Sequence, residues 1–187
     1  MKTFIVPVNF SPCSADAARY AVDLAQEMNA EVHLLHVVQI PVASAELSMT
    51  EDLYNQVFEL VASSLKELQE ELRWRANNRV PIHTASLTGS ITAGVSELCD
   101  KLKPELVVLG VTGKTLEKFL TGSPVNAMLH LRQPILVVPE HAVFHPYRQI
   151  ALACDETDIN RGVPHSIPLI KELAERFQAK VDIVNVE

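Results

Sequence analysis

The sequence predicts an α/β fold in which an open, parallel sheet of five strands carries helices on both faces. Two observations point to this fold. Short runs of consecutive apolar residues alternate with longer segments whose apolar residues recur at helical spacing. Within the short runs apolar and polar residues do not alternate, which is typical of strands that are buried on both faces. A regular alternation of strands and helices implies right-handed crossovers and therefore parallel strands.

The first elements can be assigned from their boundaries. A strand is expected over residues 4–8, and the polar residue Asn9 follows it. Ser11 followed by Pro12 is typical of a helix start, because serine caps the first turn and proline suits its first position. Apolar residues then recur at helical spacing, and a second strand is expected over 32–38.

The later elements follow the same alternation. We expect a long amphipathic helix over 53–72, strands over 80–87, 106–109 and 135–138, and helices over 91–102 and 124–131. Sheets of this kind bind ligands at the carboxyl ends of their strands, close to the point where the strand order reverses. The positions to inspect for a site are therefore Asn9, Val37, Val38 and the residues after Leu109.

Length and composition limit the possible functions. The chain has 187 residues, 48% of them hydrophobic, which is enough for one substantial core and somewhat long for a single compact domain. Its net charge of −7 argues against nucleic acid and anionic membranes as partners. No apolar run approaches the length of a membrane span or a signal segment. Three cysteines without CxxC spacing suit a reducing compartment, so a cytoplasmic protein is expected.

The end of the chain repeats its beginning. The apolar run 150–154 ends at Asp155, as the run 4–8 ends at Asn9, and residues 173–181 align without gaps to residues 24–32. We therefore predict a first domain over 1–139, a linker over 140–148 and a partial second domain over 149–187. A lone strand-helix-strand unit leaves sheet edges and apolar faces uncovered. Either the chain is a piece of a tandem protein, or this unit docks on the first domain or on a neighbouring chain.

Two glycine clusters carry the strongest chemical signal. Gly110 and Gly113 follow the fourth strand, and after eight further residues Gly122 and Ser123 open the fourth helix. Glycines let backbone N–H groups approach a phosphate, and the N–H groups at a helix start favour negative charge. The same residues could also serve only as a turn and a helix cap.

These features together resemble the universal stress protein family. Its ATP-binding members carry Gly, two residues, Gly, nine residues, Gly and then Ser or Thr, with an Asp after the first strand. This sequence has eight residues in the long interval and Asn9 at the Asp position, and its last strand reads PILVVP. The resemblance covers nearly all of residues 1–139 and implies a Rossmann-like fold of the adenine nucleotide alpha hydrolase type.

The resemblance also implies a set of ligand-binding residues. Phosphates of ATP or a related adenine nucleotide would lie at the glycine clusters, the ribose or adenine near the first strand, and the base near the second. The residues implied for the phosphates are Gly110, Gly113, Gly122 and Ser123. Asn9 would face the ribose or adenine, and Val37 or Val38 would offer backbone groups to the base. Compared with Asp, Asn9 adds a donor but lacks the carboxylate that could accept from two ribose hydroxyls or help hold Mg²⁺.

The sequence is compatible with two functions. The first is a nucleotide-binding stress protein that acts through conformation or partner choice. The second is a nucleotide-free relative that acts as a dimerisation or interaction module. No nucleophile with an adjacent base is visible, so we expect no catalytic residues and at most slow ATP hydrolysis. A homodimer is expected through the strand Ile135–Val138 or through pairing with the second repeat.

No metal site is expected from the histidines. His33 and His36 are three residues apart on one strand, so their side chains point to opposite faces of the sheet. They cannot hold one ion together.

Overall fold

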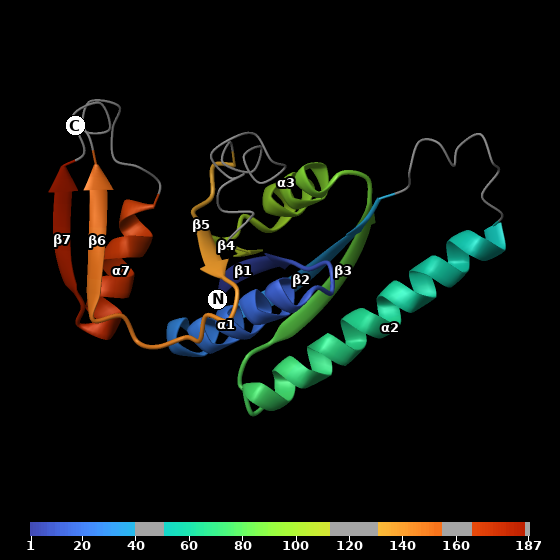
Figure 1. Ribbon diagram of the computed structural model, residues 1–187, viewed down its shortest axis with the longest axis horizontal. Helices are drawn as coiled ribbons and strands as arrows, with labels where there is room; N and C mark the ends of the chain where they lie inside the picture. The colour runs from blue at the N-terminus through green and yellow to red at the C-terminus, as the bar shows by residue number, and fades with distance from the viewer. Residues whose placement is uncertain (40–50, 113–130, 155–165, 186–187) are drawn as a thin grey trace.

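The protein is described by a computed structural model that covers residues 1–39, 51–112, 131–154 and 166–185 (Figure 1). The elements of the first domain are β1 (Lys2–Pro7), α1 (Pro12–Met28), β2 (Ala30–Val38), α2 (Glu51–Arg75), β3 (Ile82–Thr88), α3 (Ile91–Leu102), β4 (Leu106–Val111) and β5 (Ile135–Pro139). They are followed by β6 (Gln149–Cys154), α7 (Ile167–Phe177) and β7 (Lys180–Asn185).

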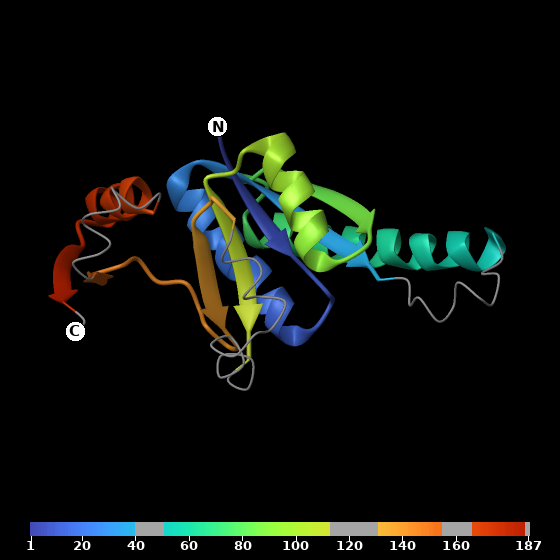
Figure 2. The same cartoon turned by 90° about the horizontal axis from the view of Figure 1, so that it is seen from above.

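The first domain is built on a parallel sheet of five strands in the order β3-β2-β1-β4-β5. α1 and α2 pack on one face of it and α3 packs on the other (Figure 2). This confirms the predicted fold class. The chain builds the sheet outward from β1 to β3 and then returns to the other side of β1, so the strand order reverses between β1 and β4. A ligand is expected at this reversal.

α1 forms where the sequence predicts it. Ser11 has an extended backbone, and its Oγ accepts a hydrogen bond from the Ser14 N–H at 3.3 Å, with Pro12 at the first helical position. The helix ends at Asn29, which adopts the left-handed conformation. Its inner face carries fully buried alanines, including Ala17 and Ala21, so the helix axis can approach the sheet closely.

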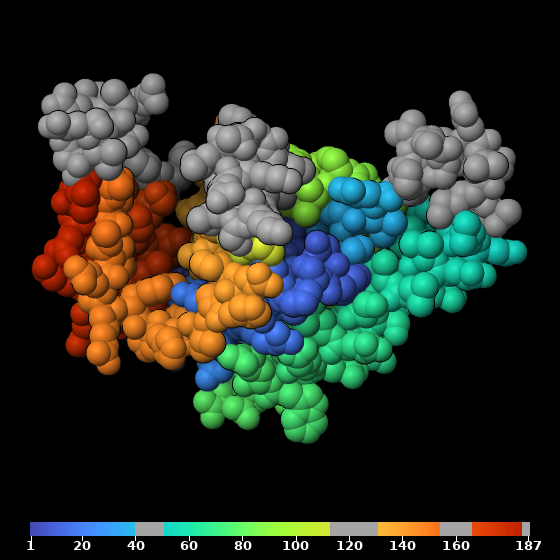
Figure 3. All heavy atoms as spheres, viewed as in Figure 1, coloured from blue at the N-terminus to red at the C-terminus, as the bar shows by residue number. Residues whose placement is uncertain are grey.

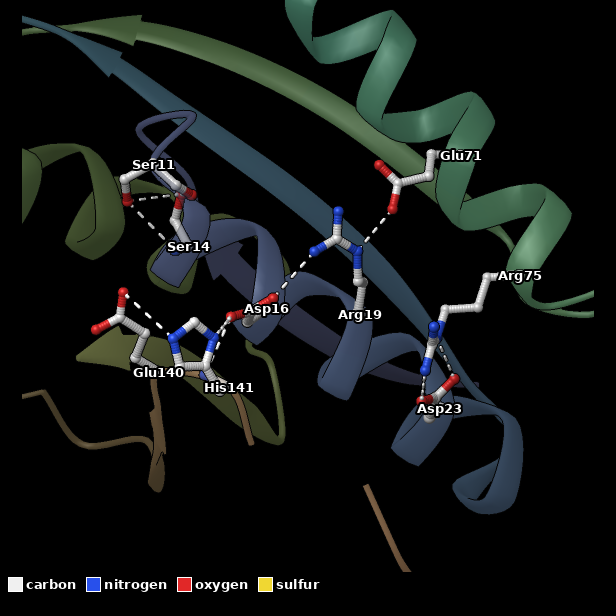
Figure 4. Close-up of polar contacts among 9 residues, drawn as sticks. All are labelled: Ser11, Ser14, Asp16, Arg19, Asp23, Glu71, Arg75, Glu140 and His141. Atoms are coloured by element: carbon white, nitrogen blue, oxygen red, sulfur yellow. Dashed lines mark hydrogen bonds and ion pairs between the residues drawn. The ribbon is translucent and has the colours of Figure 1, made fainter. Parts of the chain in front are cut away.

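α2 covers the sheet with only part of its length. Its buried residues are Val61, Leu65, Leu68 and Leu72, whereas Leu60 is 69% exposed. The first turns of α2 extend beyond the sheet (Figure 1). Two arginines on opposite helices join α2 to α1: Arg19 contacts Glu71 at 2.6 Å, and Arg75 contacts Asp23 at 2.7 Å (Figure 4).

The C-terminal unit is a separate parallel pair, β6 and β7, connected by α7. α7 packs against the core of the first domain through Leu169, Leu173 and Phe177. Two ion pairs, Lys2 with Glu172 and Arg176 with Glu27, support this docking. That the unit is a second copy of the domain start stays a prediction, but its strand-helix-strand order is the one expected.

The predicted linker also packs on the first domain. Tyr20 from α1, Phe144 and Tyr147 from the linker, and Phe177 from α7 form an aromatic cluster with ring centroids 5.3–6.0 Å apart. The hydroxyl groups of Tyr20 and Tyr147 are 2.9 Å apart. Burial and this hydrogen bond raise the pKa of Tyr147, so it stays protonated. The segment lies against the body of the molecule (Figure 3).

The described helices include none that is both long and apolar enough to cross a membrane.

Candidate functional site

The strand order reverses between β1 and β4, and the carboxyl ends of these strands lie beside the start of α1. The ladder between these strands pairs Phe4 with Leu106 and Ile5 with Val107, whereas the ladder between β4 and β5 continues to Val111. Beyond Ile5, the start of α1 lies beside β4. The backbone ends of β1, β2 and β4 therefore meet around the first turn of α1, where the sequence predicts the ligand.

Asn9 is exposed immediately after β1 and shapes the turn into α1. Its Oδ1 accepts hydrogen bonds from the Ser11 N–H at 3.2 Å and the Ser11 hydroxyl at 2.6 Å. Its own N–H donates to Ser14 Oγ at 3.3 Å. The side-chain carbonyl therefore serves the turn, and the amide nitrogen is the donor that Asn9 can offer to a ligand. Figure 4 shows Ser11 and Ser14 at this end of α1.

An aromatic pair lies at the carboxyl ends of β1 and β2. Phe10 has a φ of 61° and is 39% exposed, and its ring stacks on His36 with centroids 4.6 Å apart. His36 Nδ1 lies 2.8 Å from the Val8 carbonyl, which holds the imidazole in place. Positive φ is uncommon in a residue with a side chain and costs backbone energy. Sequence reasoning missed this pair, because neither the left-handed backbone nor the stacking leaves a sequence signal.

Val37 and Val38 form the end of β2 and are paired with Leu87 and Thr88 of β3. The Val38 carbonyl accepts a hydrogen bond from the Gly89 N–H at 3.1 Å. The Val37 side chain packs into the cluster under α3, and the Val38 side chain packs into the cluster under α1 and α2. Both valines lie at the carboxyl end of the sheet, where the sequence predicts the ligand. Their contact with a base stays a prediction.

Gly110 has a packing role that the sequence did not reveal. It lies within β4, and a Cβ atom at this position would be 2.4 Å from the carbonyl oxygen of Cys13 and 2.9 Å from its carbonyl carbon. Both atoms belong to the backbone, so they cannot rotate away. A glycine is therefore required here for α1 to start beside β4, whether or not a phosphate binds.

Cys13 lies at this contact as a buried free thiol. Burial, and then the negative charges of Glu140 and Asp16, raise its pKa above the usual thiol value. The thiol is therefore neutral at physiological pH and contributes packing at the start of α1.

The remaining predicted residues, Gly113, Gly122 and Ser123, lie outside the described residues, as does most of the predicted helix 124–131. The described part of the loop ends at Thr112, directly after β4. Of the predicted site residues, the structure thus places Asn9, Val37, Val38 and Gly110 at the carboxyl end of the sheet.

Two surface hollows can be compared with this arrangement. One, of about 460 Å³, is lined by Gln39, Thr88, Gly89 and Ser90 at the carboxyl ends of β2 and β3. A larger one, of about 560 Å³, lies at the amino ends of β4 and β5, and its lining includes Arg132 and Leu169. Neither of these two hollows lies at the reversal between β1 and β4, and we place the candidate site there because the reversal and the start of α1 coincide at the carboxyl ends of these strands.

Comparison with known proteins agrees with the resemblance noted in the sequence. A model of the universal stress protein family matches residues 1–139. A universal stress protein of Methanocaldococcus jannaschii is 31% identical over 144 residues, which is 73% of this chain and 81% of the relative. Universal stress protein G of Escherichia coli O157:H7 is 29% identical over 152 residues, or 73% of this chain and 98% of the relative.

Solved structures share the fold at lower identity. A universal stress protein from Archaeoglobus fulgidus has a TM-score of 0.73 at 13% identity, with 100% of this chain and 66% of that chain covered. A universal stress protein in complex with cAMP has a TM-score of 0.51 at 21% identity, and covers 74% of this chain and 97% of its own. Another Archaeoglobus fulgidus structure, in complex with dAMP, has a TM-score of 0.53 at 13% identity, over 73% and 97% of the two chains.

Proposed function

The chain belongs to the universal stress protein family, and we propose that it binds an adenine nucleotide at the carboxyl ends of β1, β2 and β4. Binding would act through conformation or partner choice in a stress response. The proposed role is that of a binding protein without efficient catalysis, since no nucleophile with an adjacent base is legible in the sequence. ATP is the nucleotide that the sequence resemblance implies, and solved relatives in complex with cAMP and dAMP support the wider class.

The observation that carries this proposal is the strand reversal beside the start of α1. At this point the end of β4, the first turn of α1 and the exposed Asn9 lie at the carboxyl end of the sheet. The end of a sheet can bind phosphate without a surplus of basic residues when backbone N–H groups and a helix dipole supply the attraction. A net charge of −7 is therefore compatible with an anionic ligand.

The hydrogen bonds of Asn9 indicate which of its side-chain atoms can contact the nucleotide. Because its Oδ1 already accepts two hydrogen bonds from Ser11, Asn9 would approach the nucleotide with its amide nitrogen. An amide donor suits a ribose oxygen or a ring nitrogen, and it does not bind Mg²⁺. We therefore expect this chain to bind the nucleotide with little dependence on magnesium.

A thermal-shift titration tests the proposal. ATP, ADP, AMP and cAMP are added with and without Mg²⁺, and a ligand that binds only the folded chain raises the melting temperature. At a nucleotide concentration 100 times the Kd, the gain is about 2.7 kcal/mol, or roughly 5–10 °C for a chain of this size. The absence of a shift at millimolar concentrations of all four nucleotides would contradict nucleotide binding.

Two variants localise the binding. Gly113→Val adds a branched side chain at the predicted phosphate loop and should abolish the shift. Arg132→Ala alters the hollow at the opposite end of the sheet and should leave the shift intact. A shift lost in Arg132→Ala and kept in Gly113→Val would move the site to that other hollow.

The nucleotide-free alternative also has specific support. The close contact with Cys13 is enough to explain why residue 110 is a glycine. The side-chain carbonyl of Asn9 already accepts hydrogen bonds from Ser11 in its own turn. In this alternative the chain is an interaction module, and the titration above would give no shift with any nucleotide.

Self-association is the second part of the proposed role. β5 lies at one edge of the sheet, where an apolar strand can pair with a second copy of itself. Its residues Ile135, Leu136 and Val137 are only half-buried within one chain. This supports the expected homodimer through Ile135–Val138, and docking of α7 on the same chain supports the competing arrangement in which the C-terminal unit is the partner.

A further inference from the structure

A polar cluster interrupts one face of the sheet at the amino ends of β2 and β3. Residues of this face further along the strands, such as Leu35 and Leu87, pack under α3. At the uncovered end the same face carries Glu31 and His33 on β2 and His83 on β3. Because α3 does not cover this end of the face, polar side chains can lie here, and these three gather at one corner of the sheet.

The sheet itself brings the three side chains together. His33 and His83 are directly paired in the β2–β3 ladder, and Glu31 lies two residues before His33 on the same face. The imidazole rings stack with centroids 4.6 Å apart. His33 Nε2 lies 3.2 Å from Glu31 Oε1, and His83 Nε2 lies 3.5 Å from Glu31 Oε2. One ligand atom from each residue falls within 4.8 Å of the other two.

We propose that Glu31, His33 and His83 form a binding site for a borderline divalent metal ion, with zinc as the best-suited probe. Two atoms bound to one zinc ion at about 2.1 Å and a tetrahedral angle lie roughly 3.4 Å apart. The separations from His33 Nε2 to Glu31 Oε1 and from His83 Nε2 to Glu31 Oε2 are both close to this value, so each carboxylate oxygen faces one imidazole. Two imidazoles with a single carboxylate suit zinc and its neighbours, whereas magnesium and calcium require mainly oxygen ligands.

The surroundings of the cluster hold its carboxylate in position. The Thr3 hydroxyl donates to Glu31 Oε1 at 2.9 Å, and the Thr3 N–H donates to Glu105 Oε2 at 2.6 Å. Such outer contacts orient metal ligands.

The site is open on one side. The side chain of His83 is 52% exposed, while those of His33 and Glu31 are 15% and 22% exposed. Three protein ligands leave a fourth position for water or for a group from another molecule. Sequence reasoning excluded a metal site by comparing His33 with His36, and the partner that matters, His83, is on the neighbouring strand.

Zinc titration of the full chain tests this site. We expect one zinc ion per chain in competition with a chromophoric chelator, and a visible Co²⁺ spectrum typical of a low-coordinate nitrogen and oxygen site. His83→Gln and Glu31→Gln should each weaken zinc binding on the order of 100-fold. Mutation of a residue that only hydrogen-bonds to a metal ligand typically lowers metal affinity about 10–100-fold, and loss of a ligand itself should cost at least as much. Both residues are at a sheet corner, so circular dichroism should confirm that the variants fold.

Two control variants distinguish this cluster from other zinc ligands in the chain. His145→Gln removes an exposed histidine, and Cys154→Ser removes a cysteine, both outside the cluster. Each should leave the zinc stoichiometry and affinity unchanged. Zinc binding that is absent in the natural sequence, or that survives in folded His83→Gln and Glu31→Gln, would overturn the proposal.

Discussion

Gly110→Ala should destabilise the protein by about 3 kcal/mol, at the upper end of the usual cost of overpacking a core. The added methyl group would be 2.4 Å from the carbonyl oxygen of Cys13, so α1 and β4 must move apart. For a chain of this length, the melting temperature should fall by roughly 6–12 °C. Urea unfolding followed by circular dichroism measures the loss.

A matched substitution exists in α3. At Gly94, an added Cβ would meet side-chain atoms alone, with a Val37 methyl group at 2.7 Å and a Leu87 methyl group at 3.7 Å, and the helix would gain from replacing glycine by alanine. Gly94→Ala should therefore be much milder than Gly110→Ala. Equal losses of stability in the two variants would show that α1 and β4 are not in close backbone contact at Gly110.

Phe177→Ala should release the C-terminal unit from the first domain. Phe177 packs against Phe144 at 5.9 Å and Tyr147 at 5.3 Å, and with Leu169 and Leu173 it anchors α7 to the core. Complete burial of a phenylalanine is worth about 3–5 kcal/mol, and this one is half-buried, so we expect a loss of about 2 kcal/mol. Proteolysis between residues 140 and 166 should accelerate by roughly tenfold or more.

The matched control lies in the same C-terminal unit. Ile183 on β7 is 72% exposed, so Ile183→Ala removes a large apolar side chain without removing a docking contact. Its proteolysis rate should match that of the natural sequence. If Phe177→Ala and Ile183→Ala are cleaved equally fast, α7 does not hold the C-terminal unit on the first domain.

The fold could be predicted from the sequence because its signals are local. α3 spans Ile91–Leu102 as expected, since Ser90 caps its first turn and Lys103 ends it in the left-handed conformation. α2 was less completely predicted: its apolar stripe begins at Leu53, but Leu53 and Leu60 are exposed where the helix extends past the sheet. Helical periodicity shows which face of a helix is apolar and not how far the neighbouring sheet reaches.

The candidate site could be predicted only in part. Asn9 was located because it follows a strand, and its hydrogen bonds to Ser11 depend on a turn that spacing does not reveal. The role of Gly110 arises from a contact with Cys13, nearly one hundred positions earlier in the chain. His33 and His83 meet through the register of two strands, which sequence spacing alone does not determine. Contacts between elements were therefore the part that sequence reasoning missed.

We propose above all that an adenine nucleotide binds where the strand order reverses, at the carboxyl ends of β1, β2 and β4. Amide chemical-shift mapping with saturating AMP and ATP tests this location directly. We predict the largest changes at the amides of Asn9, Val38 and Val111, with little change at Glu105 and Leu169 at the other end of the sheet. Changes confined to Glu105, Arg132 and Leu169, or no changes with either nucleotide, would contradict the account.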